Sequence, residues 1–155
     1  DLSRTLCDAC RGLGLRTHPG GTYVCIEGPA FSTKAESKAY RLWGGDVIGM
    51  TGATEARLAR EAEICYATMN LVTDYDVWHE EEEPVTVEMI LDNLKLNIGN
   101  AKAAVRKAVA ALPDPRGDAC GCGRALTNTI VTRPDLIPRA VRTALAPIVG
   151  KRLPR

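Results

Sequence analysis

The sequence has little net charge, only two histidines and no long apolar run. In its 155 residues, 20 lysines and arginines are nearly balanced by 19 aspartates and glutamates, which gives no general basic field for binding nucleic acid. No apolar stretch reaches the roughly 18 residues that a membrane-spanning helix needs, and no secretory signal pattern is visible. Since 25% of the residues are charged and 45% are apolar, we expect an ordinary globular protein of the cytoplasm, without nucleic-acid or membrane partners.

The sequence also lacks the short motifs of common nucleotide-binding folds. It contains neither a Gly-x-Gly-x-x-Gly fingerprint nor a Walker loop. Its two histidines, His18 and His79, stand alone, whereas metal-binding histidines come with partners at set spacings. We therefore expect neither histidine to be a ligand.

Six cysteines are more than a cytoplasmic chain needs, and two close pairs stand out among them. A zinc site made of Cys7, Cys10, Cys120 and Cys122 would join pairs more than 100 residues apart, whereas zinc ribbons keep their ligand pairs close. Cys7 and Cys10 also have the spacing of buried small side chains on a helix. We therefore expect no metal site. Inert thiols and disulfides both stay open for Cys7, Cys10, Cys25, Cys65, Cys120 and Cys122.

Apolar periodicity and turn residues predict alternating strands and helices. The capping-box pattern from Thr33 to Glu36 marks one helix start, and the nearly continuous apolar run over 64–72 predicts a strand covered on both faces. This order is typical of an α/β fold with a mixed, partly parallel sheet flanked by helices. The expected strands are 21–28, 46–50 and 64–72, and the expected helices are 33–43, 54–62, 86–112, 120–131 and 134–148, after a helical opening segment.

Ligands of such sheets bind where the strands end, and the first two strand ends carry suitable residues. Phe31 follows a Gly28–Pro29 turn, where a loop aromatic can stack on a planar ligand or fold back over the next helix. Met50 and Thr51 lie between small residues at a strand-to-helix junction. The Thr51 hydroxyl and the N–H groups of a helix start suit an anion such as phosphate.

The third strand end places Asp74 and Asp76 on either side of Tyr75. In extended backbone, residues two apart point the same way, so the two carboxylates would repel and the pKa of one would rise. A protonated carboxyl group can donate to N7 of a purine and make the base a better leaving group, while a carboxylate can accept from an exocyclic amino group. The alternative is an acidic pair that caps a helix or solvates a loop, as we interpret glutamates 80–83.

Together these segments resemble the methylthioadenosine phosphorylases of the trimeric branch of the purine nucleoside phosphorylase family. The resemblance runs from about Gly20 to Leu112. The segments that carry it are Gly21-Thr22-Tyr23-Val24-Cys25-Ile26-Glu27-Gly28-Pro29, Phe31-Ser32, Ala35-Glu36-Ser37, Asp46-Val47-Ile48, Met50-Thr51, Ile64-Cys65-Tyr66-Ala67, Thr73-Asp74-Tyr75-Asp76 and Trp78.

The resemblance implies phosphorolysis of 5′-methylthioadenosine, with inorganic phosphate as co-substrate and no cofactor. It assigns the reading of adenine N6 and N7 to Asp74 and Asp76, with Asp74 the N7 donor and Tyr75 beside the substrate. The 6-oxopurine branch has asparagine in place of Asp74, so Asp74 favours 6-aminopurines. The other implied roles are stacking by Phe31, packing on the nucleoside by Met50, phosphate binding by Thr51, and substrate preference at Ser32 and Val87.

The same resemblance implies a homotrimer whose active sites lie at subunit interfaces. A residue around Ile130 would line a neighbour's methylthio pocket. Some heat-adapted relatives form disulfides at a Cys-x-Cys similar to Cys120-Gly121-Cys122, which strengthens the disulfide interpretation without fixing partners.

Family chains are much longer, and their amino-terminal half carries the glycine-rich phosphate loop. We therefore expect residues 1–155 to be the C-terminal part of a single nucleoside phosphorylase domain. Two alternatives remain open, a 6-oxopurine nucleoside or methylthioinosine phosphorylase and a purine-binding fragment without turnover.

Overall fold

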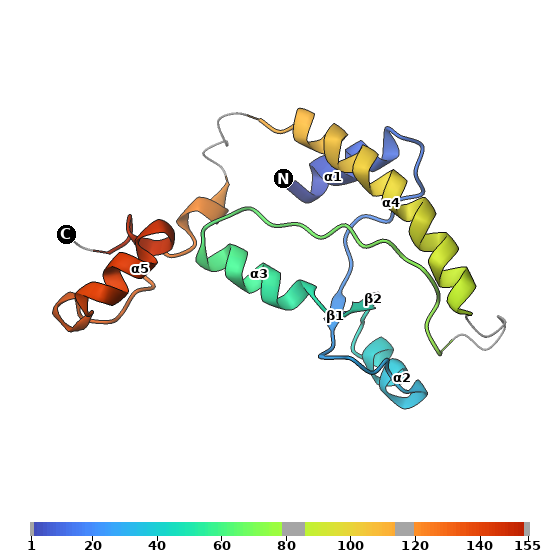
Figure 1. Cartoon of the computed structure of the whole chain (residues 1–155), viewed down its shortest axis with the longest axis horizontal. Helices are drawn as coiled ribbons and strands as arrows, with labels where there is room; N and C mark the ends of the chain where they lie inside the picture. The colour runs from blue at the N-terminus through green and yellow to red at the C-terminus, as the bar shows by residue number, and fades with distance from the viewer. Residues whose placement is uncertain (1, 79–85, 114–119, 154–155) are drawn as a thin grey trace. The chain divides into compact units, whose positions relative to one another are not determined.

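The computed structural model describes residues 2–78, 86–113 and 120–153 (Figure 1). The chain divides into two compact units. Unit 1 comprises Asp1–Ala53 and Thr68–Leu112, and unit 2 comprises Thr54–Ala67 and Pro113–Arg155. In chain order the elements are α1 (Leu2–Arg11), β1 (Tyr23–Cys25), α2 (Lys34–Leu42), β2 (Val47–Gly49), α3 (Gly52–Glu61), α4 (Val87–Ala110), the 3₁₀ helices η1 (Gly121–Arg124) and η2 (Pro134–Leu136), and α5 (Arg139–Val149).

Unit 1 contains a small parallel sheet of β1 and β2, joined through α2. Tyr23 pairs with Val47 and Cys25 with Gly49. The predicted strands over 21–28 and 46–50 are therefore confirmed, although each is shorter than predicted. The parallel part of the predicted sheet is confirmed as well, since β1 and β2 pair in parallel. Parallel neighbours need a crossover connection, and α2 supplies it.

Helix α2 begins with the predicted capping box. The Thr33 hydroxyl oxygen accepts a hydrogen bond from the Glu36 N–H at 3.3 Å, and the Thr33 N–H donates to the Glu36 carboxylate at 2.7 Å. These hydrogen bonds satisfy donors that a helix start otherwise leaves unpaired. The bond from the Thr33 backbone, followed by the bond from its hydroxyl, lowers the pKa of Glu36.

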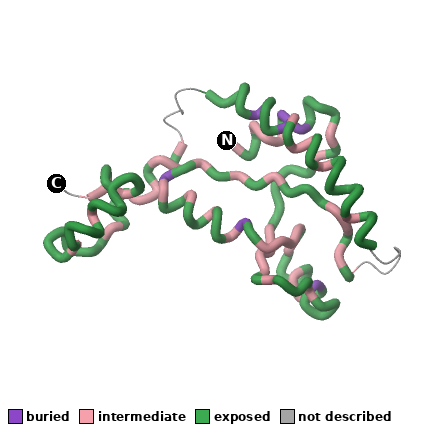
Figure 2. Tube along the Cα trace, viewed as in Figure 1, coloured by how far each residue is buried: buried purple, intermediate pink, exposed green. Residues whose placement is uncertain are grey.

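Helix α4 packs against α1 (Figure 1), and buried residues gather where the two helices meet (Figure 2). Ala9 and Cys10 on α1 and Ala104 and Ala108 on α4 are all buried. Small residues let two helices approach closely, which explains why Cys10 occupies this position. The helical opening segment and the predicted helix over 86–112 are confirmed, the latter with Thr86 accepting from the Met89 N–H at 3.2 Å.

The predicted strand over 64–72 is wrong. This segment follows α3 in an irregular conformation, and several of its large apolar side chains, including Ile64 and Val72, are exposed. A strand requires a hydrogen-bonded neighbour, and among the described residues β1 and β2 pair only with each other. An apolar run therefore does not by itself specify a strand, because it does not supply the hydrogen-bonded partner that a strand requires.

The last two predicted helices need correction. Over 120–131 only the single 3₁₀ turn η1 forms, followed by turns, because Gly121 and Gly123 are poor helix residues. The helix predicted over 134–148 begins later, at Arg139, after the separate 3₁₀ turn η2. Pro138 precedes the helix, where a missing N–H costs little.

Unit 2 is held together around a buried carboxylate, Glu63. Its oxygens accept from Lys151 Nζ at 2.7 Å, from the Arg152 guanidinium at 2.9 Å and from the Leu126 N–H at 3.0 Å. The bond from Lys151, assisted by those from Leu126 and Arg152, outweighs burial and lowers the pKa of Glu63 to about 2. The carboxylate thus joins the segment after α3 to the segment after α5.

In the described ranges, no helix combines the length and apolar character needed to cross a membrane.

Candidate functional site

Asp74 and Asp76 lie in unit 1 and are held by neutral donors. The Thr73 hydroxyl donates to one Asp74 oxygen at 2.7 Å, and the Asp76 N–H donates to the other at 2.9 Å. The Ser37 hydroxyl, on α2, donates to Asp76 Oδ2 at 2.6 Å. Ser37 is 3% exposed and both aspartates are half-buried, so the site is partly shielded from solvent.

The backbone turns between the two aspartates, which corrects the expectation of an extended segment. Asp76 has φ of +61°, in the left-handed region that aspartate tolerates better than most residues. The Asp76 N–H bonded to the Asp74 carboxylate stabilises this turn. The carboxylates therefore do not stand side by side as in a strand, and each engages a different donor.

Two amide side chains of α4 hold the backbone that leads into this turn. Asn93 Nδ2 donates to the Thr73 carbonyl at 2.9 Å, and Asn97 Nδ2 donates to the Val72 carbonyl at 3.2 Å. Residues four apart lie on one face of a helix, so both amides reach the same strip of chain. Neither the motifs nor the resemblance assigned a role in the site to Asn93, Asn97 or Ser37, although the four-residue spacing of the two asparagines was a usable signal.

A cavity of about 260 Å³ lies beside the aspartates. Asp74, Tyr75, Asp76 and Trp78 line one side, and residues of α2, β1 and β2 complete it. The Arg41 guanidinium lies 3.5 Å from the ring centroid of Trp78, and the Tyr75 and Trp78 rings meet edge to face at 6.3 Å. A hollow with aromatic walls and a few polar groups suits a planar ligand that carries hydrogen-bonding edges.

Three other predicted residues do not line this cavity. Phe31 is 81% exposed on its loop, and Val87, the first residue of α4, is also exposed. Thr51 is exposed directly before α3. The described structure therefore groups Asp74, Tyr75 and Asp76 around the cavity. The roles predicted for Phe31, Thr51 and Val87 stay predictions.

Met50 and Ser32 are half-buried, unlike Phe31, Thr51 and Val87, which are exposed. Met50 covers Gly28, whose φ is +73°, and a Cβ atom there would lie 2.7 Å from the Met50 sulfur. The Ser32 hydroxyl is buried and has no hydrogen-bond partner among the described residues. Since buried hydroxyls are nearly always paired, this one is available to a ligand.

The residue expected near a methylthio group, Ile130, lines an apolar hollow of about 350 Å³ in unit 2. Leu136, Val141, Leu145 and Val149 line the same hollow. This hollow suits an apolar group such as a thioether. The role of Ile130 stays a prediction.

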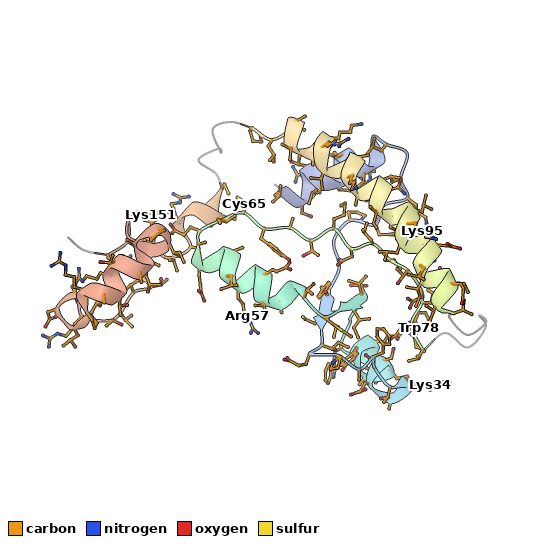
Figure 3. All side chains as sticks on the ribbon, in the orientation of Figure 1. Lys34, Arg57, Cys65, Trp78, Lys95 and Lys151 are labelled. Carbon is orange, nitrogen blue, oxygen red and sulfur yellow. The ribbon has the colours of Figure 1, made fainter. Side chains whose placement is uncertain are left out.

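Unit 2 also contains three cysteines, Cys65, Cys120 and Cys122, that we call the thiol cluster. Of these, Cys65 is labelled in Figure 3. Their sulfur atoms all lie within 4.8 Å of one another, and those of Cys65 and Cys120 are 3.3 Å apart. No disulfide joins them in the described structure, and all three are half-buried. The hydrogen bond with Cys120, followed by burial and the bond with Cys122, raises the pKa of the Cys65 thiol.

The thiol cluster differs from the grouping that the sequence analysis weighed. That analysis combined Cys120 and Cys122 with Cys7 and Cys10, whereas the structure brings Cys65 to them. No spacing rule relates a lone cysteine after α3 to a pair 55 residues later, so this contact was not predictable.

Residues 1–110 match the model of the phosphorylase superfamily. The chain is 52% identical over 155 residues to an S-methyl-5′-thioadenosine phosphorylase of Gloeobacter violaceus, which covers 97% of this chain and 52% of that protein. It superimposes on a methylthioadenosine phosphorylase from an antarctic soil metagenomic library with a TM-score of 0.83 and 41% identity, over 95% of this chain and 52% of that one.

A methylthioadenosine phosphorylase of Schistosoma mansoni in complex with adenine is also similar. Its TM-score is 0.71 and its identity 30%, over 88% of this chain and 53% of that one. The chain thus spans about half the length of the curated relatives that it matches.

Proposed function

Because this chain belongs to the phosphorylase superfamily, we propose that the protein cleaves 5′-methylthioadenosine with inorganic phosphate. The products are adenine and 5-methylthioribose 1-phosphate. The names of its relatives support this substrate, and the chain resembles them over nearly its whole length.

The observation that carries the proposal is the pair of half-buried aspartates beside an aromatic-lined cavity. Asp74 protonates N7 of adenine as the bond to the sugar breaks, which turns the base into a neutral leaving group. Asp76 accepts a hydrogen bond from the amino group at N6. Ser37 occupies Asp76 Oδ2, and within the described part of the chain no donor is bonded to Oδ1.

The remaining groups serve the sugar and the phosphate. Thr51 binds the attacking phosphate, and Met50 and Phe31 contact the nucleoside. The buried Ser32 hydroxyl, which is unpaired among the described residues, contributes to substrate preference, as does Val87 at the start of α4. Phosphate then attacks the anomeric carbon as positive charge develops on the sugar ring.

The aspartate at position 74 favours 6-aminopurines over 6-oxopurines. A carboxyl group can donate to N7, whereas an asparagine at this position cannot transfer a proton in the same way. A 6-oxopurine or methylthioinosine phosphorylase is the alternative enzyme, and a purine-binding fragment without turnover is the alternative for the chain alone.

We place the protein in the cytoplasm as a homotrimer that uses no cofactor, with residues 1–155 as the C-terminal part of one phosphorylase domain. Exposed apolar side chains on α4, such as Leu91, Leu94 and Ile98, support association, because burying them against another surface is favourable.

The test is adenine release from 5′-methylthioadenosine, with and without phosphate, beside inosine and adenosine. It uses the full natural polypeptide that contains these residues, and the 155-residue chain in parallel. Phosphate-dependent adenine release by the full polypeptide supports the proposal. Preference for inosine overturns the role of Asp74, and the absence of turnover in the full polypeptide overturns the activity.

A further inference from the structure

The thiol cluster of unit 2 has no part in the proposed reaction, and its geometry is that of a metal site. Cys120 precedes η1 and Cys122 lies in its first turn, so the two thiols come from one short loop. Cys65 comes from the segment after α3, 55 residues earlier. We propose that Cys65, Cys120 and Cys122 bind one zinc ion through three thiolate ligands.

The distances between the sulfur atoms suit zinc. Zinc–sulfur bonds of about 2.3 Å in a tetrahedral centre place the sulfur atoms about 3.7 Å apart. The sulfur atoms of Cys65 and Cys120 are 3.3 Å apart, close to this value, and no two of the three sulfur atoms are more than 4.8 Å apart. Small rotations of the three side chains would place all three sulfur atoms around one zinc ion.

The chemistry of three thiols also favours a soft divalent cation. Binding exchanges three S–H protons for three zinc–sulfur bonds, which leaves a centre of net charge −1 and releases three protons. No oxidant is needed. A tetrahedral zinc ion has one further position, which a water molecule or another ligand fills.

A disulfide is the alternative for these residues, but it engages only two of the three thiols. Joining two of the thiols requires an oxidant, brings two sulfur atoms to about 2.05 Å and leaves the third cysteine unpaired. Zinc engages all three cysteines together in a reducing compartment. The site would tie the segment after α3 to η1 and stabilise unit 2, independently of the proposed function of unit 1.

The experiment measures zinc in the full natural polypeptide, purified under reducing conditions with zinc present and then freed of loose metal. About one zinc ion per chain is expected. Cobalt substituted for zinc should show the intense near-ultraviolet charge-transfer band of thiolate ligands. Cys65→Ser, Cys120→Ser and Cys122→Ser should each lose most of the metal, whereas Cys7→Ser, on α1, should keep it.

A serine variant that fails to fold would also lose zinc, so circular dichroism checks that each variant is folded. The cobalt spectrum of the unaltered protein identifies thiolate ligands without any substitution. Three results overturn the proposal. They are unaltered protein without stoichiometric zinc, a cobalt form without the thiolate band, and equal zinc loss in Cys7→Ser and the cluster variants. Zinc-free protein with a disulfide among the three cysteines would assign the thiol cluster to redox chemistry instead.

Discussion

Glu63 in unit 2 and the Asp74–Asp76 pair in unit 1 carry the same functional group among different partners. Glu63 is 1% exposed and accepts from two cationic side chains. The aspartates are half-buried, and their hydrogen-bond donors are hydroxyls and a backbone N–H. A carboxylate neutralised by cations is committed to holding the fold, whereas a carboxyl group held by neutral donors beside a cavity can still exchange a hydrogen bond or a proton with a ligand.

The largest effect expected from this contrast is on catalysis. Asp74→Asn, in the full natural polypeptide, should lower kcat/KM for 5′-methylthioadenosine about 100- to 10,000-fold, because the N7 proton donor is lost. The melting temperature should change little. Asp92→Asn is the matched control, since Asp92 is exposed on α4, lies outside the cavity and forms an ion pair with Lys95 at 3.2 Å. Equal losses in both variants would contradict the role of Asp74.

The second effect is on stability and comes from the other side of the comparison. Glu63→Gln should lower the melting temperature by several degrees at neutral pH, since Lys151 and Arg152 lose their anionic partner. Thermal unfolding followed by calorimetry measures the shift. An unchanged melting temperature would show that the ion pairs do not hold unit 2 together.

The same carboxylate predicts a dependence of stability on acid. Its pKa is about 2 in the folded protein and 4.5 without the interactions, so the unfolded chain takes up the proton first as the pH falls. The contribution of Glu63 is therefore complete above about pH 4.5 and lost between about 4.5 and 2. Urea titrations across this range should show a steeper fall for the unaltered protein than for Glu63→Gln.

A smaller effect is expected where a neutral donor positions a carboxylate. Ser37→Ala removes the hydroxyl that donates to Asp76 at 2.6 Å. We expect about a five-fold fall in kcat/KM, carried mainly by KM, because the carboxylate remains and only its orientation loosens. Ser37→Thr should restore part of the loss, whereas a merely structural role would leave KM unchanged in folded protein.

The smallest effect tests the fold beneath the aspartate site. Thr33→Ala removes the capping box of α2 and should cost about 1 kcal/mol of stability. Activity of the folded protein should stay within about two-fold of normal, because Thr33 does not line the cavity beside the aspartates. Denaturant unfolding measures the stability, and a large loss of activity would indicate that the start of α2 positions Ser37 more strictly than the capping bonds imply.

Local patterns in the sequence predicted the elements whose hydrogen bonds are local. The capping box at Thr33 and the helix starting beyond Thr86 both formed as predicted, since their bonds connect residues within four positions. The strand over 64–72 did not form, because a strand depends on a neighbour that the apolar run does not specify. The helix expected over 120–131 failed where glycines outweighed the weak periodicity.

The candidate site shows the same division. The sequence identified Asp74, Tyr75 and Asp76 as a group, and the structure places them along one cavity. It did not identify Ser37, Asn93 or Asn97, which act across 20 or more residues through hydrogen bonds. A local sequence pattern indicates which reactive side chains are present. Contacts between distant segments decide which other residues position those side chains.

The sequence by itself determined the family, the helices with local caps and the aspartates of the candidate site, because these depend on residue identity and on spacings of a few residues. The tertiary structure alone decided that Ser37 binds Asp76, that two cationic side chains neutralise Glu63, and that Cys65 joins Cys120 and Cys122. These contacts require the backbone to bring remote segments within hydrogen-bonding or ligand distance, and no local periodicity encodes that distance.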